Sequence, residues 1–185
     1  CLFDGPDGVL VVVPPFPVEG DYEARGYEPG PLVDLLSRDR TVLVVLVRLG
    51  RYSVGLLDGD RVVASKSGTR HVKNRHRAGG SSQRRFERSR ERLMREFFDR
   101  VCVEAHSLLE ARPDLGQGVE YVLYGGESGT VRGFRARCDF VERLRAPVLA
   151  RLLPVDRPGH KAMQAIGAEV YSSATLILRR SIDHG

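Results

Sequence analysis

The sequence predicts one layered α/β domain built on a mixed β-sheet. Three β-rich segments, at residues 41–47, 51–57 and 61–65, follow one another with only tight turns between them, which is typical of an antiparallel meander. The second half of the chain then alternates between helical apolar patterns and short β-rich runs. That alternation is typical of parallel strands joined by helices.

The composition is typical of a domain that folds on its own and binds a polyanion. The chain has 185 residues, 42% of them hydrophobic, which is ample for a core at this size. Its formal net charge is +5, and only three of its 29 basic residues are lysine. A positive excess indicates a polyanionic partner, although a GC-rich genome explains the arginine bias equally well.

Residues 1–40 are rich in Pro and Gly and predict an N-terminal arm or small flanking element. Within them we expect a short strand at residues 9–13 and a brief helix at residues 31–37. The main domain is expected to occupy residues 41–185. Because the chain does not begin with Met, we expect the natural chain to start further upstream.

The elements of the main domain follow from local patterns. Residues 41–47 form a nearly continuous run of β-branched residues and Leu, which predicts a strand buried on both faces. The Asp58-Gly59 pair is a hairpin signal between the second and third strands. Apolar residues spaced three and four apart predict one long amphipathic helix over residues 84–111, and Pro113 ends it.

The last third of the chain predicts two more strands and two more helices. We expect a strand at residues 120–124, a helix at 128–143, a short strand within 145–153 and a final helix over 156–177. The order of three meander strands followed by helix, strand, helix, strand and helix resembles a ribonuclease H-like topology. Topology alone does not fix function.

The cysteines and apolar runs indicate a cytoplasmic protein. Cys1, Cys102 and Cys138 show neither metal-type nor paired spacing, and an odd number without a signal peptide indicates a reducing compartment. The apolar runs are too short to span a bilayer, so no membrane association is expected.

A metal-dependent nuclease is disfavoured by the positions of the carboxylates. Such an enzyme needs clustered acids at strand ends to hold two metal ions, and the first core strand carries none. Asp58 and Asp60 lie in a hairpin turn, while Glu120 and Glu127 are better explained as solvated strand ends. We therefore expect no metal site.

Other catalytic sets are also incomplete. Cys102 and His106 stand four residues apart on the long helix, where a thiol can reach an imidazole, but nothing supplies a third, orienting group. His71 and His76 have no Cys or carboxylate that completes a metal set. A Walker loop ends in Gly-Lys-Ser or Gly-Lys-Thr, and neither Gly68-Thr69 nor Gly80-Ser81 supplies that ending. No nucleotide cofactor is therefore expected.

The most strongly charged segment lies between the third strand and the long helix. Residues 66–92 hold ten Lys or Arg against two acids and centre on Gly79-Gly80-Ser81-Ser82-Gln83. Glycines permit backbone conformations closed to other residues, and arginine pairs with phosphates and stacks on bases. A basic loop over residues 66–83 suits entry into folded RNA. The alternative is a flexible linker with a serine helix cap.

This arrangement resembles the catalytic domain of the eukaryotic and archaeal class-one peptide release factors. The specific motif is the glycine pair leading to Gln83, on a basic loop before the long helix. Those factors carry Gly-Gly-Gln, whereas two serines separate Gly80 from Gln83 here. A wider spacing is similar to that of the Vms-like release factors, which free nascent chains from stalled large ribosomal subunits. The resemblance covers residues 41–177.

The resemblance implies a metal-independent peptidyl-tRNA hydrolase that acts in ribosome rescue. Gln83, Gly79 and Gly80 would be the catalytic residues. A carboxamide does not titrate near neutrality, so Gln83 would orient a water molecule and donate to developing charge. The expected partners are the large ribosomal subunit and peptidyl-tRNA, bound by a monomer. The expected RNA-binding residues are Arg70, Lys73, Arg75, Arg77, Arg84, Arg85 and Arg88.

Two alternatives remain open on sequence grounds. One is a non-catalytic RNA-binding or ribosome-docking domain that keeps the fold and the basic loop. The other is a nuclease that cuts the tRNA backbone near its CCA end. The sequence does not decide whether the bond cleaved is the peptidyl ester or a phosphodiester. Residues 1–40 are too few for a stop-codon-reading domain, so a stalled subunit is the expected substrate.

Overall fold

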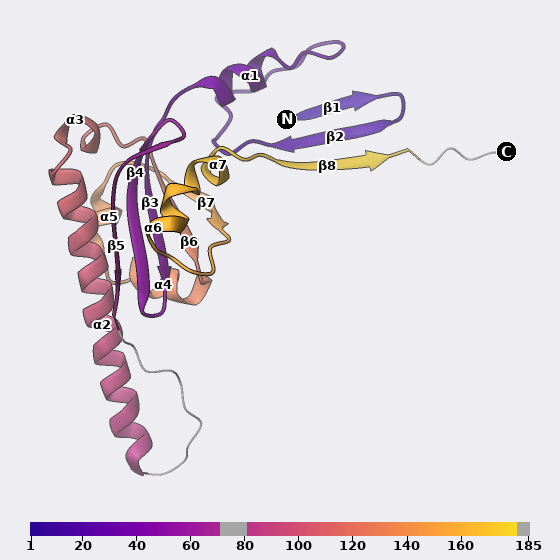
Figure 1. Ribbon diagram of the computed structural model, residues 1–185. Coiled ribbons are helices and arrows are strands. Elements are labelled where there is room, and N and C mark those ends of the chain that lie inside the picture. The colour runs from indigo at the N-terminus through magenta and orange to yellow at the C-terminus, as the bar shows by residue number, and fades with distance from the viewer. Residues whose placement is uncertain (71–80, 181–185) are drawn as a thin grey trace.

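The computed structural model describes residues 1–70 and 81–180, and its centre is a five-stranded mixed sheet (Figure 1). Its strands are β3 (Thr41–Arg48), β4 (Arg51–Asp58), β5 (Arg61–Thr69), β6 (Tyr121–Gly126) and β7 (Val148–Leu153). They lie in the order β5-β4-β3-β6-β7. The first three form the predicted antiparallel meander, and β6 and β7 add in parallel. The predicted layered α/β class with a mixed sheet is confirmed.

Helices cover both faces of this sheet. One face carries α2 (Ser81–Glu110), α4 (Ser128–Arg135) and α5 (Asp139–Arg143); the other carries α6 (His160–Gln164) and α7 (Ile166–Val170). Alternate residues of β3 point to opposite layers: Val45 packs in the cluster that contains Phe97, and Val44 in the cluster that contains Met163. The run of buried residues 42–47 follows from this double cover.

Helix α2 extends well beyond the sheet. It begins at Ser81, three residues before the predicted start, and its first buried described side chain is Phe97. Leu93 and Met94 already pack against the core, so the 12 residues from Ser81 to Leu93 span about 18 Å at 1.5 Å per residue. Figure 1 shows the first half of α2 projecting past the strands. Long as α2 is, neither it nor another helix in the described ranges is apolar enough to cross a bilayer. After α2, Pro113 begins the short α3 (Pro113–Gly116).

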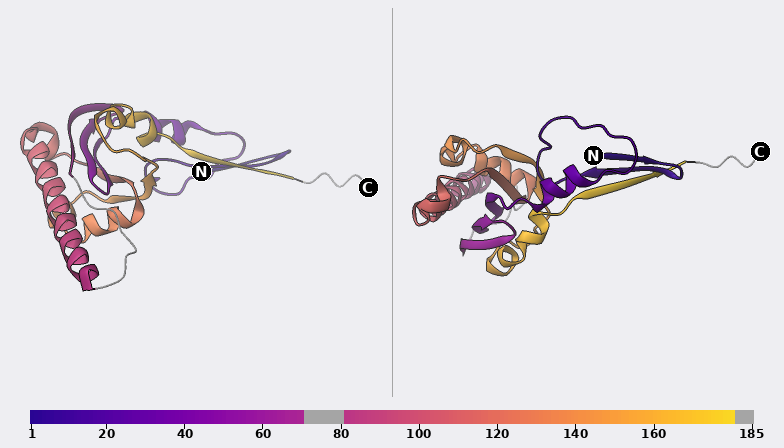
Figure 2. Two further views of the ribbon diagram at one scale, coloured as in Figure 1. Left: turned by 60° about the horizontal axis from the view of Figure 1, so that its bottom comes forward. Right: turned by 90° about the horizontal axis from the view of Figure 1, so that it is seen from above.

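The prediction of a final helix over residues 156–177 is wrong at both ends: the helical part begins at His160, not after Asp156, breaks at Ala165 between α6 and α7, and ends at Val170. Beyond Val170 the chain forms β8 (Ala174–Arg179), which pairs antiparallel with β2 (Gly8–Val13). The stretch Thr-Leu-Ile-Leu is a good strand former, and β2 supplies the hydrogen-bonding partner that local periodicity does not reveal. With β1 (Leu2–Gly5), these strands make a second sheet of order β1-β2-β8 that projects from the body (Figure 2). The predicted strand at residues 9–13 and helix α1 (Gly30–Ser37) are confirmed.

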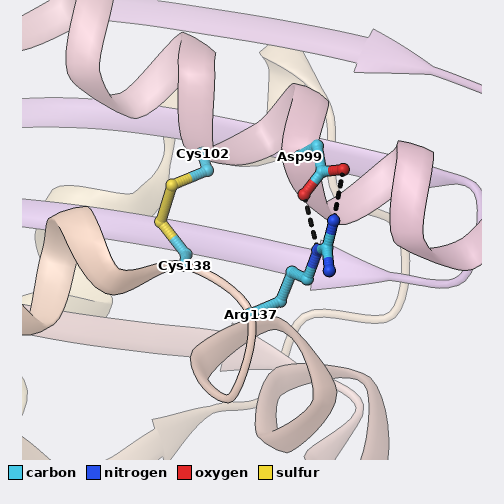
Figure 3. The surroundings of a disulfide bond; sticks show 4 residues. All are labelled: Asp99, Cys102, Arg137 and Cys138. Carbon is cyan, nitrogen blue, oxygen red and sulfur yellow. Dashed lines mark hydrogen bonds and ion pairs between the residues drawn. A yellow bond between two sulfur atoms is a disulfide. The ribbon is translucent and has the colours of Figure 1, made fainter.

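The predicted helix over residues 128–143 is interrupted. Helix α4 ends at Arg135 and α5 begins at Asp139, with Cys138 in the connection. Cys138 is fully buried and forms a disulfide with Cys102 of α2 (Figure 3), whereas Cys1 is free and exposed. The expectation that the cysteines show no pairing is therefore wrong. The break between α4 and α5 brings Cys138 against α2, and a continuous helix pattern gives no sign of that contact.

Beside the disulfide, an ion pair gives the fold a weak dependence on pH. Arg137 donates from Nε to Asp99 Oδ1 at 2.7 Å and from Nη2 to Oδ2 at 2.9 Å (Figure 3). The hydrogen bond from Arg137 lowers the pKa of Asp99 below its ordinary value. Because the folded pKa is the lower one, the stabilisation is present at neutral pH and is lost as pH falls below about 4 and through the folded pKa.

We expect Asp99→Asn to lower the free energy of unfolding at pH 7 by less than about 1 kcal/mol, because both partners are half exposed. The difference from the native chain should shrink toward zero in acid. Urea denaturation at neutral and at strongly acidic pH measures both quantities. Asp34→Asn, an exposed acid on α1, is the matched control. A deficit that is undiminished in acid would contradict the assignment.

Candidate nucleic-acid interface

The predicted site residues lie close together in sequence, just before and within the first turns of α2, and the structure describes only some of them. The backbones of Gln83 and Arg84 lie in the first turn of α2, and their side chains are not described. Arg70, Arg85 and Arg88 are described in full. The predicted residues outside the described ranges are Lys73, Arg75, Arg77, Gly79 and Gly80.

Ser81, Ser82 and Gln83 are helical, although the sequence predicts that the loop continues to Gln83. Strand β5 likewise continues to Thr69, four residues past its predicted end at Ser65. The first N–H groups of a helix have no acceptor within it and carry partial positive charge. The backbone N–H of Gln83 therefore has no hydrogen-bond acceptor within α2 and can donate to another group.

Two arginines of the projecting half of α2 are available to a ligand. Arg85 and Arg88 are exposed, and neither makes an ion pair with another described residue. Guanidinium groups in this state present several donors to an incoming phosphate. The structure thus presents these two predicted RNA-binding residues on a surface that extends beyond the sheet.

Arg70, a predicted RNA-binding residue, makes contacts within the fold. Its backbone N–H donates to the Gly50 carbonyl at 2.9 Å, and its guanidinium pairs with Glu96 of α2, which Arg92 also approaches at 3.8 Å. Arg70 therefore fastens the end of β5 to α2. Glu96 lies 26 residues further along the chain, so no local pattern could reveal this partner.

A second ion pair holds the same strand on the same helix. Glu104 is only 8% exposed and accepts from Lys66 Nζ at 3.2 Å and from Arg100 Nη2 at 2.6 Å. Lys66 lies on β5, and the other two residues lie on α2. A partly buried carboxylate with two cationic partners is well satisfied. Together with Arg70–Glu96, this cluster fixes β5 against α2 over about 12 Å of helix, which anchors the projecting half.

Further basic residues lie where the sheet ends nearest the projecting half of α2. Figure 1 shows the end of β5, the β3–β4 turn and α4 at this end of the molecule. Arg51, the first residue of β4, and Arg132 of α4 are exposed. Arg48 instead pairs with Asp156, Nη1 to Oδ1, at 2.7 Å. The sequence does not single out Arg51 and Arg132, because they stand outside the charged segment and only the fold places β4 and α4 at this end.

The carboxylates considered for a metal site have structural partners. Glu120 accepts from Arg40 Nη1 at 3.0 Å and from the Thr41 N–H at 3.1 Å. Glu127 accepts from the Thr130 hydroxyl at 2.6 Å. These contacts favour the interpretation of both as strand-end residues. Within residues 1–70 and 81–180, no three His, Cys, Asp or Glu side chains gather as a metal site.

The thiol and imidazole considered for nucleophilic catalysis are also engaged elsewhere. Cys102 is held in the disulfide, so it presents no thiolate. His106 Nδ1 lies 3.2 Å from Glu110 Oε2, and the ring packs edge-on against Phe140 with 4.6 Å between centroids. The described part of the chain thus offers no alternative nucleophile at this position.

Comparison with known families places this geometry among release factors. Residues 40–174 match a family model described as the Actinobacteria/chloroflexi VLRF1 release factor. The match includes the five-stranded sheet, the charged segment and α2. It agrees with the Vms-like resemblance carried by the glycine pair and Gln83.

The chain is also similar to archaeal termination factors. It is 36% identical over 78 residues to peptide chain release factor subunit 1 of Aeropyrum pernix, which is 42% of this chain and 21% of that protein. It is 31% identical over 104 residues to the Methanopyrus kandleri protein of the same name, which is 56% of this chain and 24% of that one. The chain thus spans less than a quarter of the length of these curated relatives.

A solved structure, the archaeal translation termination factor aRF1, shares the fold. The TM-score is 0.51 at 22% sequence identity, covering 78% of this chain and 40% of that one. This likeness supports the mixed α/β architecture and is silent on activity.

Proposed function

Because the chain belongs to the Actinobacteria/chloroflexi VLRF1 release factor family, we propose that it hydrolyses peptidyl-tRNA on stalled large ribosomal subunits. The main structural support is the projecting half of α2, whose first turn contains Gln83. A helix whose first 12 residues, about 18 Å, precede its first contact with the core would carry that residue into a narrow RNA site while the domain stays outside.

Gln83 would act by positioning. The ester that joins the peptide to the tRNA is attacked by water at its carbonyl carbon, and negative charge develops on the carbonyl oxygen. The side-chain amide and the backbone N–H of Gln83 are both donors, and donors fixed near a developing oxyanion stabilise the transition state. A carboxamide takes up no proton near neutrality, so the proton of the attacking water ends on the tRNA ribose oxygen through other groups. Gly79 and Gly80 would allow close approach of backbone to RNA.

The arginines supply the binding energy for this placement. Arg85 and Arg88 on α2, with Arg51 and Arg132 at the sheet end, present exposed cations on the side from which α2 projects. Arg84 and the basic residues Lys73, Arg75 and Arg77 add charge in the adjoining sequence. RNA binding through such contacts is strong and falls with salt concentration.

We expect the double variant Arg85→Ala/Arg88→Ala to bind large ribosomal subunits more weakly and to depend less on salt. Each lost phosphate contact lowers the slope of log affinity against log salt by about 0.7 to 0.9, so the slope should fall by about 1.5. Sedimentation with large subunits over a range of KCl concentrations measures it.

The matched control is Arg25→Ala/Arg179→Ala, which removes two exposed arginines from the segments at the opposite end of the molecule (Figure 1). It should leave the slope unchanged. An equal loss in both double variants would mean that net charge matters and the position of the arginines does not.

One experiment separates hydrolysis from its alternatives. Large subunits carrying labelled peptidyl-tRNA are incubated with the protein, and both the peptide and the 3′ end of the freed tRNA are analysed. We expect free peptide and an intact CCA end, with no inhibition by 1,10-phenanthroline in excess Mg²⁺. A shortened CCA end would identify strand cutting, and binding without release would identify a docking domain.

A further inference from the structure

The chain divides into an acidic start and a basic remainder. Residues 1–40 hold eight Asp or Glu and three Arg, a net charge of −5, while the other 145 residues hold 26 basic and 16 acidic residues, a net charge of +10. The acidic part, with β1, β2 and α1, lies at the opposite end of the molecule from the projecting half of α2 (Figure 1). Phosphate repels this part, so it faces away from bound RNA.

The acidic part contains a groove of about 690 Å³ between β1, the segment over residues 18–28 and the start of α1. Its apolar wall includes Leu2, Val18 and Leu32, with Leu35 buried beneath. The Phe3 and Tyr27 rings pack at 5.4 Å between centroids and hold the segment over β1. Several apolar side chains remain open to solvent in the groove, including Leu2 at 66% and Val18 at 51%, and such patches mark binding surfaces.

Three carboxylates on the groove have no cationic partner among residues 1–70 and 81–180. Asp21, Glu23 and Glu28 are exposed and line the groove, and none of them forms an ion pair with another described residue. The neighbouring acids differ in this respect. Glu19, outside the groove, pairs with Arg38 and Arg40, and Asp4, on its wall, pairs with Arg180.

We propose that this groove docks an extended protein segment in which Lys or Arg alternates with aliphatic residues. The aliphatic side chains would enter the apolar wall, and the cations would pair with Asp21, Glu23 and Glu28. A site that combines apolar area with complementary charge selects such a partner. RNA carries the wrong charge for this surface. The docking is independent of peptide release, since the groove shares no residue with the proposed catalytic segment.

The test uses a fluorescent peptide of alternating Leu and Lys, with fluorescence anisotropy as the readout. We expect saturable binding in about the micromolar range that weakens as salt rises. Asp21→Asn/Glu23→Gln/Glu28→Gln should weaken it about tenfold, the combined effect of three exposed ion pairs. These side chains are exposed, so the variant should fold normally, and its peptide release should equal that of the native chain.

The matched control, Asp7→Asn/Asp34→Asn/Asp60→Asn, removes as many exposed carboxylates outside the groove and should bind the peptide as the native chain does. A peptide of alternating Leu and Glu should not bind. The proposal is overturned if the Leu-Lys peptide fails to bind at about 1 mM, or if both triple variants weaken its binding equally.

Discussion

Replacing Gln83 by Ala should reduce peptide release by at least about 100-fold while affinity for the large subunit stays unchanged. The loss of one fixed donor to a developing oxyanion typically costs between about 100-fold and 1000-fold in rate. The substitution keeps the helix, since Ala is the best helix former. Single-turnover release of labelled peptide and sedimentation with large subunits measure the two quantities separately. A split between rate and affinity is the signature of a residue that acts in the transition state.

The controls for this prediction separate side chain from backbone. Gln117→Ala removes an exposed carboxamide next to α3 and should have no effect. Gln83→Pro also removes the backbone N–H, and Pro is tolerated in the first helical turn. If Ala retains release and Pro abolishes it, the backbone N–H is the working donor. Release that survives both substitutions would falsify a catalytic role for this residue.

Breaking the disulfide should produce the largest change in stability. For two cysteines 36 residues apart, the loss of the cross-link is expected to cost about 3 to 4 kcal/mol through the entropy of the unfolded chain. In a domain of this size, that lowers Tm by about 10 °C. Calorimetry of Cys102→Ala/Cys138→Ala, and of the native chain with a reducing agent, should give the same shift.

The remaining cysteine supplies the control for the disulfide. Cys1→Ala should leave Tm unchanged, because Cys1 is exposed and free. Thiol titration of the unfolded, non-reduced chain should find one reactive thiol, and reduction should raise this to three. Three thiols before reduction would contradict the cross-link.

The fold class could be predicted because local sequence patterns indicate its main helices and strands. The meander of β3, β4 and β5 follows from β-rich runs and an Asp-Gly turn, and α2 follows from apolar spacing over eight turns. The final strand β8 could not be predicted. The local sequence around β8 does not distinguish a strand from a helix. Its pairing partner, β2, lies more than 160 residues earlier in the chain.

The candidate site also has a part that the sequence shows and a part that only the fold shows. The glycine pair, Gln83 and the charged segment are visible in the sequence because they are contiguous. The partner of Arg70 is not visible in the same way, since its guanidinium pairs with Glu96 of α2. Arg51 and Arg132 are isolated in sequence, and only the fold places their elements at the same end of the sheet.

The sequence by itself determined the layered architecture, the charged segment before α2 and the release-factor resemblance, because each depends on residues close together in the chain. The tertiary structure alone decided which charges are free, which cysteines pair, how the N-terminal strands meet β8, and that α2 extends past the sheet. Those outcomes depend on contacts between residues far apart in sequence, and periodicity and composition carry no record of such contacts.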